Sequence, residues 1–192
     1  KPILSFNRNI QENLSDYSLR LWDIDSGRII QSFQIPPSRL VGYRGNVFKN
    51  NVLCMTFSPD RRKILTGNGD STATLIDIAS ATTVFHLDAH SVKRTDIGYD
   101  SGTTAVAFSP GGKYLMTGGW DGVIKQWDST TGTEMRQWNA HKGSIRNIRF
   151  TQDGSRFLSS CYRSNEDRAI HLWDWSGGQL IASASGHTDT VQ

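Results

Sequence analysis

Short segments of alternating apolar and polar residues recur along the chain. Residues 55–57, 106–108 and 148–150 have this pattern, and each is followed, after a turn rich in Pro, Gly or Asp, by a second short apolar segment. Alternation at period two between turn signals predicts antiparallel strands joined by hairpins. We find no segment with helical periodicity. The predicted fold class is therefore all-β, with about four strands per repeat.

An internal repeat organises these segments. In each copy an Asp precedes, by six residues, a Trp that is itself followed by Asp. The copies pair Asp16 with Trp22, Asp121 with Trp127, and Asp167 with Trp173, whereas Asp70 pairs with Ile76 in place of the tryptophan. A further block ends in histidine at His90, His141 and His187. Because the blocks recur in register, the signal is far more specific than a single Trp-Asp pair.

The combined pattern resembles the WD-repeat β-propeller family, whose blades are four-stranded antiparallel sheets. The resemblance covers nearly all of residues 1–192. It implies a partial blade at 1–34, a divergent blade at 35–87, blades at 88–138 and 139–184, and the first strand of a further or closing blade at 185–192.

The resemblance also implies a hydrogen-bonded network inside each blade. The implied members are Ser5, Asp16 and Trp22; Thr66 and Asp70; His90, Thr117, Asp121 and Trp127; His141, Ser159, Asp167 and Trp173; and His187 at the start of the next repeat. In the blade at 35–87, Ile76 replaces the Trp and no Ala/Gly-His precedes it. Packing alone is therefore expected to hold that blade.

About four blades are present, whereas propellers generally contain about 4–8. The chain opens in what resembles the second strand of a blade, residues 2–6, and closes in the first strand of another, residues 188–192. We expect a section of a larger propeller. The alternatives are a ring completed by a second copy, and a four-bladed ring in which 188–192 pair with 2–6.

The charge balance and the cysteine content indicate which partners and which cellular compartment suit the chain. Lys and Arg number 21 against 18 Asp and Glu, giving a net charge of +3, which is too weak a field to argue for nucleic acid by itself. The two cysteines, Cys54 and Cys161, have neither disulfide-framework nor metal-site spacing. No signal peptide or membrane-length apolar run is present. We expect an intracellular protein, cytoplasmic or nuclear and not secreted, that does not bind membranes.

Catalytic chemistry has little support. His141, Ser159 and Asp167 are the residue types of a hydrolase triad. However, the same types recur in each repeat with a Trp at the end, which indicates satisfied buried polar groups rather than one active site. The five histidines are scattered, and no metal or nucleotide motif is present. The sequence therefore predicts a protein that is not an enzyme and has no cofactor.

Long connections offer binding surfaces. They cover residues 7–15, 35–51, 91–103 and 161–166, and the resemblance places the loops that follow His or precede Asp on one face near the central channel. Candidate partner-binding residues are Arg94, Tyr99, Trp120, Lys142, Arg146, Tyr162 and Arg163. Alternatively, the Trp120 side chain packs onto its own hairpin and takes no part in binding. Trp138 is expected in the core, and Trp175 on the opposite face from Trp173, where its ring could be exposed.

These observations predict a non-catalytic scaffold for protein–protein interactions in a multi-protein assembly. The alternative is an RNA-associated assembly factor, because residues 142–168 combine several basic side chains with Tyr162. Basic groups with aromatic neighbours suit contact with phosphate and stacking on bases.

Overall fold

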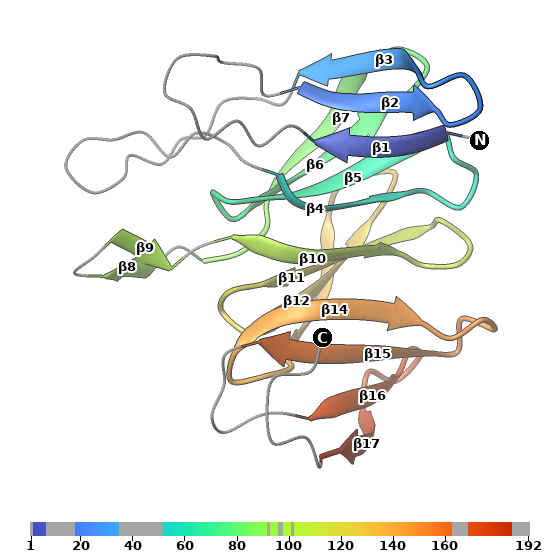
Figure 1. The fold of residues 1–192 in the computed structure, drawn as a ribbon. Coiled ribbons are helices and arrows are strands. Elements are labelled where there is room, and N and C mark those ends of the chain that lie inside the picture. The colour runs from blue at the N-terminus through green and yellow to red at the C-terminus, as the bar shows by residue number, and fades with distance from the viewer. Residues whose placement is uncertain are drawn as a thin grey trace.

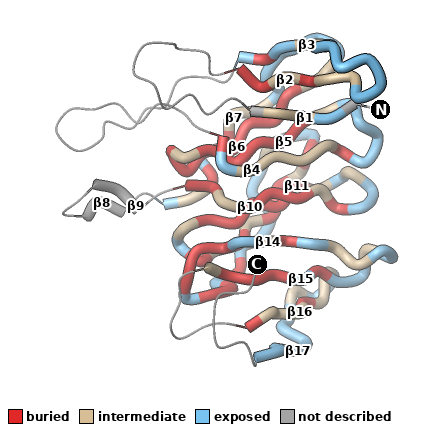
Figure 2. The backbone as a smooth tube through the Cα atoms, viewed as in Figure 1, coloured by how far each residue is buried: buried red, intermediate tan, exposed pale blue. Residues whose placement is uncertain are grey.

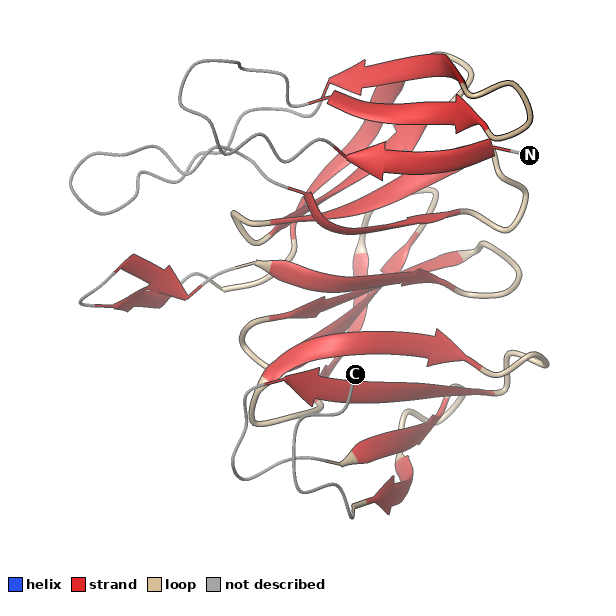
Figure 3. Cartoon of the chain, viewed as in Figure 1, coloured by secondary structure: helices blue, strands red, loops and turns tan. Residues whose placement is uncertain are grey.

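All regular structure in the described residues is β-strand, as the sequence predicts. The computed structural model describes residues 2–6, 18–34, 52–91, 93–95, 98–100, 102–162 and 169–185. Within them the strands form one three-stranded sheet, three four-stranded sheets and one two-stranded sheet, and every strand pair is antiparallel (Figure 3).

We name the larger sheets blades 1 to 4. Blade 1 contains β1 (Pro2–Phe6), β2 (Ser18–Asp23) and β3 (Arg28–Gln34). Blade 2 contains β4 (Val52–Phe57), β5 (Lys63–Asn68), β6 (Thr72–Asp77) and β7 (Thr82–Asp88). Blade 3 contains β10 (Thr103–Phe108), β11 (Tyr114–Gly119), β12 (Val123–Asp128) and β13 (Glu134–Asn139). Blade 4 contains β14 (Ser144–Phe150), β15 (Arg156–Tyr162), β16 (Ile170–Asp174) and β17 (Leu180–Ala184). Between blades 2 and 3, β8 (Lys93–Thr95) and β9 (Gly98–Asp100) form a separate hairpin.

The blades stack in chain order, with blade 1 at one end and blade 4 at the other (Figure 1). The first strand of blade 3, β10, contacts the first strands of both neighbours, β4 and β14. No described strand of blade 1 pairs with one of blade 4. The described sheets therefore form an open stack. The predicted pairing of residues 188–192 with β1 involves residues outside the described part.

Apolar side chains between neighbouring blades make up the core. Three clusters of buried residues lie at the junctions of blades 1 and 2, 2 and 3, and 3 and 4. Figure 2 shows this burial along the middle strands, with the outer strands β3 and β17 largely exposed. Each of the outer strands β3, β7 and β13 buries one large side chain, Phe33, Leu87 or Trp138. Trp138 is thus a core residue, as predicted.

Blade 4 exposes positions that the other blades bury. Strand register places Met116 of blade 3 and Leu158 of blade 4 at equivalent sites on the second strand of their sheets. Met116 is 0% exposed and packs in the junction with blade 4, whereas Leu158 is 39% exposed. Leu158 on the outward face of blade 4 therefore has no described blade that covers it.

Each Trp-Asp pair performs two tasks in its blade. The tryptophan indole donates to a hydroxyl on the preceding strand, as Trp22 Nε1 does to Ser5 Oγ at 2.7 Å. The following aspartate accepts from the next turn: Asp128 Oδ1 accepts from the N–H groups of Thr130 and Thr131 at 2.8 and 3.0 Å. The dipeptide therefore fixes both the blade interior and the turn to its outer strand.

Blade 2 holds unusual backbone at its turns. Arg61, Ser71 and Ala81 have φ of 58°, 70° and 56°, and they are the only described residues other than glycine with positive φ. The corresponding turns of blade 3 have Gly112, Gly122 and Gly132. A side chain in this left-handed region costs about 1–2 kcal/mol. Blade 2 therefore carries strain that blade 3 avoids.

Candidate functional site

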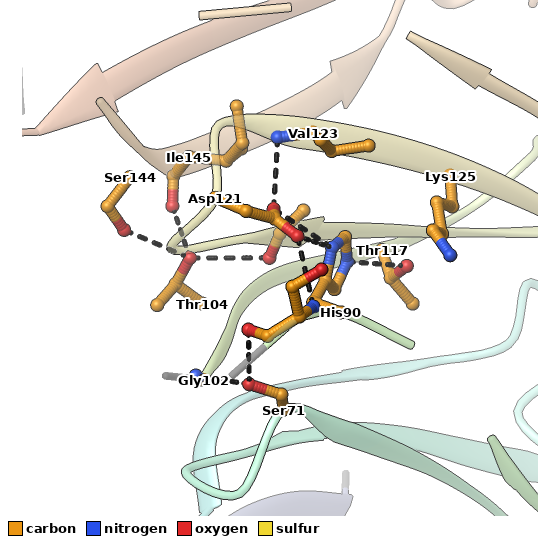
Figure 4. A network of polar contacts seen from close by, with 12 residues as sticks. Ser71, His90, Gly102, Thr104, Thr117, Asp121, Val123, Lys125, Ser144 and Ile145 are labelled. Carbon is orange, nitrogen blue, oxygen red and sulfur yellow. Dashed lines mark hydrogen bonds and ion pairs between the residues drawn. The ribbon is translucent and has the colours of Figure 1, made fainter. Parts of the chain in front are cut away.

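The predicted network of blade 3 is a continuous chain of polar contacts, and Figure 4 shows its members Thr117, His90 and Asp121. Trp127 Nε1 donates to Thr117 Oγ1 at 3.0 Å, Thr117 Oγ1 lies 2.9 Å from His90 Nε2, and His90 Nδ1 lies 3.2 Å from Asp121 Oδ1. A neutral His90 protonated on Nδ1 satisfies every member, since Thr117 then donates to Nε2 and accepts from the indole. Thr117 and Trp127 are buried, and each of the four side chains has a hydrogen-bond partner within this network.

Asp121 anchors the end of this chain. Its carboxylate also accepts from the N–H groups of Ser91 and Val123, each at 3.1 Å. Burial alone would raise the pKa of this carboxyl. The hydrogen bond with His90 and the two backbone donors outweigh burial and hold the pKa below its usual value. Asp121 thus ties the chain after His90 to the turn before β12.

Blade 4 repeats the arrangement. His141 Nε2 lies 2.8 Å from Ser159 Oγ, and Trp173 Nε1 donates to the same oxygen at 2.9 Å. Ser159 is 1% exposed, so its hydroxyl is a buried hydrogen-bond partner and not an accessible nucleophile. His171 stacks on the His141 ring, with centroids 4.2 Å apart. Asp16, Asp167 and His187 lie outside the described residues.

The expectation that packing alone holds blade 2 together is wrong. Ile76 supplies no indole, but Asn68 Nδ2 donates to Thr72 Oγ1 and Thr74 Oγ1, both at 3.0 Å, and Asn68 Oδ1 accepts from Thr66 Oγ1 at 3.1 Å. Asp70 Oδ1 accepts from Thr72 Oγ1 at 2.6 Å. The members Asn68, Thr72 and Thr74 were missed because they are ordinary residues for a strand or its turn. Their spacing around Asp70 carries no repeat signal.

Ser71 clamps both ends of the β8–β9 insertion. Its hydroxyl donates to the Ser91 carbonyl at 3.3 Å and accepts from the buried Gly102 N–H at 2.8 Å. The Gly102 carbonyl in turn accepts from the Trp120 N–H at 3.1 Å. The strained backbone of Ser71 thus places a side chain, which glycine lacks, where it fixes the base of a projecting hairpin.

Trp120 sits beside this base, half-buried. A Cβ built on Gly102, where φ is 130°, would lie 3.3 Å from Trp120 Cδ1 and 2.7 Å from Leu53 Cδ1. Gly102 therefore lets a side chain of blade 2 and one of blade 3 approach the same point of the backbone. Leu53 remains 40% exposed. Leu53 was not among the predicted candidates. The unbroken apolar run 52–55, which departs from alternation, is the feature of the sequence that could have indicated a bulge there.

The remaining described candidates lie at one end of blade 4 and in the insertion. Arg146 is exposed, with its guanidinium carbon 6.0 Å from the Tyr162 ring centroid, and Lys142 is exposed in the loop before β14. Arg156 begins β15 at the opposite end of the blade from Tyr162. Arg94 and Tyr99 face each other in β8–β9 pairing, and their side chains lie outside the described part, as does Arg163. The basic residues of 142–168 are therefore not one described patch.

Trp175 is not an exposed ring on the far face. It packs against the core between blades 3 and 4, with ring centroids 5.5 Å from Tyr114 and 5.0 Å from Phe150. Strand alternation does not apply to it, because β16 ends at Asp174 and Trp175 already belongs to the turn.

Other chemistry is sparse in the described residues. Neither Cys54 nor Cys161 is part of a disulfide, and burial raises the pKa of Cys54 to about 12. Within the described ranges, no cluster of three or more His, Cys, Asp or Glu could hold a metal ion. The same residues include no helix long and apolar enough to cross a membrane.

A comparison with protein-family models identifies the family of the chain by its repeats. The family model "WD domain, G-beta repeat" matches residues 38–77, 83–128 and 132–174, which is more than half of the chain. The chain belongs to the WD-repeat family. Each matched WD repeat is offset from a blade: the match at 83–128 covers most of β7, the outer strand of blade 2, together with β10, β11 and β12 of blade 3.

The relatives of this chain extend beyond the aligned region. The chain is 28% identical to WD repeat-containing protein 25 of Mus musculus, over 97% of this chain and 32% of the relative. It is 38% identical to pre-mRNA-processing factor 17 of Saccharomyces cerevisiae, over 43% of this chain and 18% of the relative. It is 28% identical to target of rapamycin complex subunit wat1 of Schizosaccharomyces pombe, over 83% of this chain and 43% of the relative. The aligned region spans less than half of each relative.

Proposed function

We propose that this chain is a non-catalytic WD-repeat scaffold that binds protein partners in a multi-protein assembly, in the cytoplasm or nucleus. The observation that carries the proposal is the use made of its Ser, Thr, His and Asp side chains. In blades 3 and 4 these groups satisfy one another between a tryptophan and a turn, so they stabilise a rigid platform. A buried, mutually satisfied network suits presentation of a surface and not turnover of a substrate.

Two relatives support an assembly role by name. One is a pre-mRNA-processing factor and another is a subunit of a target of rapamycin complex. The proposed binding face is the side of the stack from which the β8–β9 hairpin projects (Figure 1), and Trp120 and Arg146 are its described anchors. Arg94, Tyr99, Lys142, Tyr162 and Arg163 complete the candidate set.

Affinity purification from the source cells, with quantitative mass spectrometry, tests this function. We expect one or more proteins to co-purify with the tagged chain, and Trp120→Ser to deplete them. Met135→Ser is the matched control, because Met135 is 57% exposed on the outer strand β13, away from this face. Partners that both variants retain equally would contradict use of this face. A chain that co-purifies with no protein would contradict the scaffold function.

RNA binding remains the competing function. The pair of Arg146 and Tyr162 is the described feature that favours it, because a guanidinium beside an aromatic ring can contact phosphate and stack on a base. RNA-dependent co-purification, abolished by nuclease treatment, would favour that reading.

A further inference from the structure

The first strands of blades 2, 3 and 4 share a bulge at the same place. The pairing of β4 with β5 passes over Leu53, that of β10 with β11 passes over Thr104, and that of β14 with β15 passes over Arg146. A bulge redirects its extra residue out of the strand alternation, and bulges are frequent beside functional sites. Because β10 contacts both β4 and β14, these residues form a row across three blades. We call Leu53, Thr104 and Arg146 the bulge row.

The blade 2 end of the bulge row is apolar. Leu53 and Trp120 meet over the bare Cα of Gly102, and Thr104 Cγ2 would lie 3.7 Å from a Cβ at that position. Leu53 is 40% exposed and Trp120 is half-buried. A large apolar side chain laid against this pair would remove further apolar surface from water, which stabilises a complex by about 25 cal/mol per Å² buried.

The blade 4 end of the bulge row is cationic. Thr104 Oγ1 donates to the Ile145 carbonyl at 2.6 Å and accepts from Ser144 Oγ at 3.3 Å, so the middle of the row is fixed to β14 (Figure 4). Arg146 follows directly, exposed and lying over the Tyr162 ring. The ring orients the guanidinium and leaves its N–H edge for a carboxylate, which Arg binds through two parallel hydrogen bonds.

The Asp121 carboxylate on blade 3 is engaged at the base of the β8–β9 insertion. The Asp121 carboxylate already accepts from Ser91 and Val123 and lies against His90. The bulge row therefore presents an apolar site at one end and a cationic site at the other. Between them lies Thr104, whose hydroxyl is already hydrogen-bonded within the protein.

We propose that the bulge row binds an extended acidic segment of a partner protein. A large apolar side chain of that segment lies against Leu53 and Trp120, and a neighbouring carboxylate pairs with Arg146. The proposal rests on the proposed scaffold function and names the chemistry of its partner. A peptide fits better than RNA, because the exposed aliphatic side chain of Leu53 at one end of the row suits an apolar side chain and offers no cation to phosphate.

Selection from a displayed library of random peptides on the 192-residue chain tests the proposal. We expect selected peptides to share an Asp or Glu close to one large apolar residue. Fluorescence anisotropy with those peptides should show binding weakened about tenfold or more by Arg146→Glu and by Leu53→Asp. Arg156→Glu and Met135→Asp are matched controls of the same chemistry elsewhere on the surface, and should leave affinity unchanged. Circular dichroism melts of all four variants identify any that fail to fold.

Three results would overturn the proposal. Peptides bound equally by both bulge-row variants would place the binding elsewhere and leave the scaffold function standing. Selection of no peptide, while protein partners still co-purify from cells, would reject an extended segment but not the scaffold. Binding of labelled oligouridine that is lost in Arg146→Glu and falls steeply with salt, without any peptide binding, would assign the row to RNA.

Discussion

Ser71 and Gly122 occupy the same position in neighbouring blades and share a left-handed backbone, with φ of 70° and 75°. At Gly122 a Cβ would collide with the His141 carbonyl. At Ser71 the chain that follows His90 leads into the β8–β9 insertion, and the serine hydroxyl binds both of its ends. One position thus serves as a close backbone contact in blade 3 and as a clamp in blade 2.

Ser71→Ala should therefore destabilise the protein by about 1–3 kcal/mol, because it keeps the strained backbone and leaves the buried Gly102 N–H without an acceptor. Ala81→Gly is the contrasting variant. Ala81 is exposed with φ of 56°, so glycine should stabilise by up to about 1 kcal/mol. Urea unfolding followed by tryptophan fluorescence measures both. A neutral Ser71→Ala would contradict the clamp.

Thr117→Val should cost about 2–4 kcal/mol. Valine has nearly the same shape, but it removes the acceptor for the Trp127 indole and the partner of His90 Nε2 in a buried site. Thr83→Val is the control, because Thr83 is exposed on β7; the change should stay within about 0.5 kcal/mol. Equal unfolding midpoints for the two variants would show that the network adds nothing to stability.

Stability should fall in acid as the turn aspartates protonate. Donation from Thr151 and Ser155 holds the pKa of Asp153 at about 2, below its ordinary value of 3.8, and turn donors also lower the pKa of Asp128. Because each folded pKa is the lower one, the unfolded state binds more protons. The stabilisation that these ionised aspartates provide is therefore complete above about pH 4 and is lost as the pH falls toward 2. Chemical unfolding across that range measures the slope.

Asp153→Asn provides the control for the acid prediction. The variant should be less stable near neutral pH and should lose less stability on acidification than the parent chain. An identical slope in both proteins would assign the acid sensitivity to other carboxylates.

Met116 and Leu158 should respond differently to truncation although they occupy equivalent sites. Met116→Ala removes a fully buried side chain and should cost about 2–5 kcal/mol, whereas Leu158→Ala, at 39% exposed, should cost less than about 1 kcal/mol. Denaturant unfolding at low protein concentration compares them. Equal losses would mean that the outward face of blade 4 is covered in solution, and light scattering would then measure the mass of the associated species.

The sequence predicts the blades because their determinants are local and repeated. Each Trp-Asp pair and each hairpin turn recurs at the spacing that a four-stranded sheet needs, and blades 3 and 4 follow it closely. Two features escape this reasoning. The Asn68 network uses residues that occur in any strand. The bulge row depends on a one-residue slip in pairing, which leaves only a weak trace at Leu53 and none at Thr104 or Arg146.

Two tryptophans show where the alternation of side chains along a strand stops predicting the direction of a side chain. Trp138 lies within a strand, and its burial follows from the pattern. Trp175 lies one residue past the end of β16, where the turn, and not the pleat, sets its direction toward Tyr114 and Phe150. Sequence periodicity predicts side-chain direction only as far as the strand extends.

The offset between WD repeat and blade bears on how the protein unfolds. The match at 83–128 contributes to the outer strand of blade 2 and supplies three strands of blade 3, so no single repeat contains a whole sheet. Removing that segment would strip an edge from one sheet and dismantle the next. Neighbouring blades should consequently melt together in one cooperative transition, although each contacts mainly its immediate neighbours.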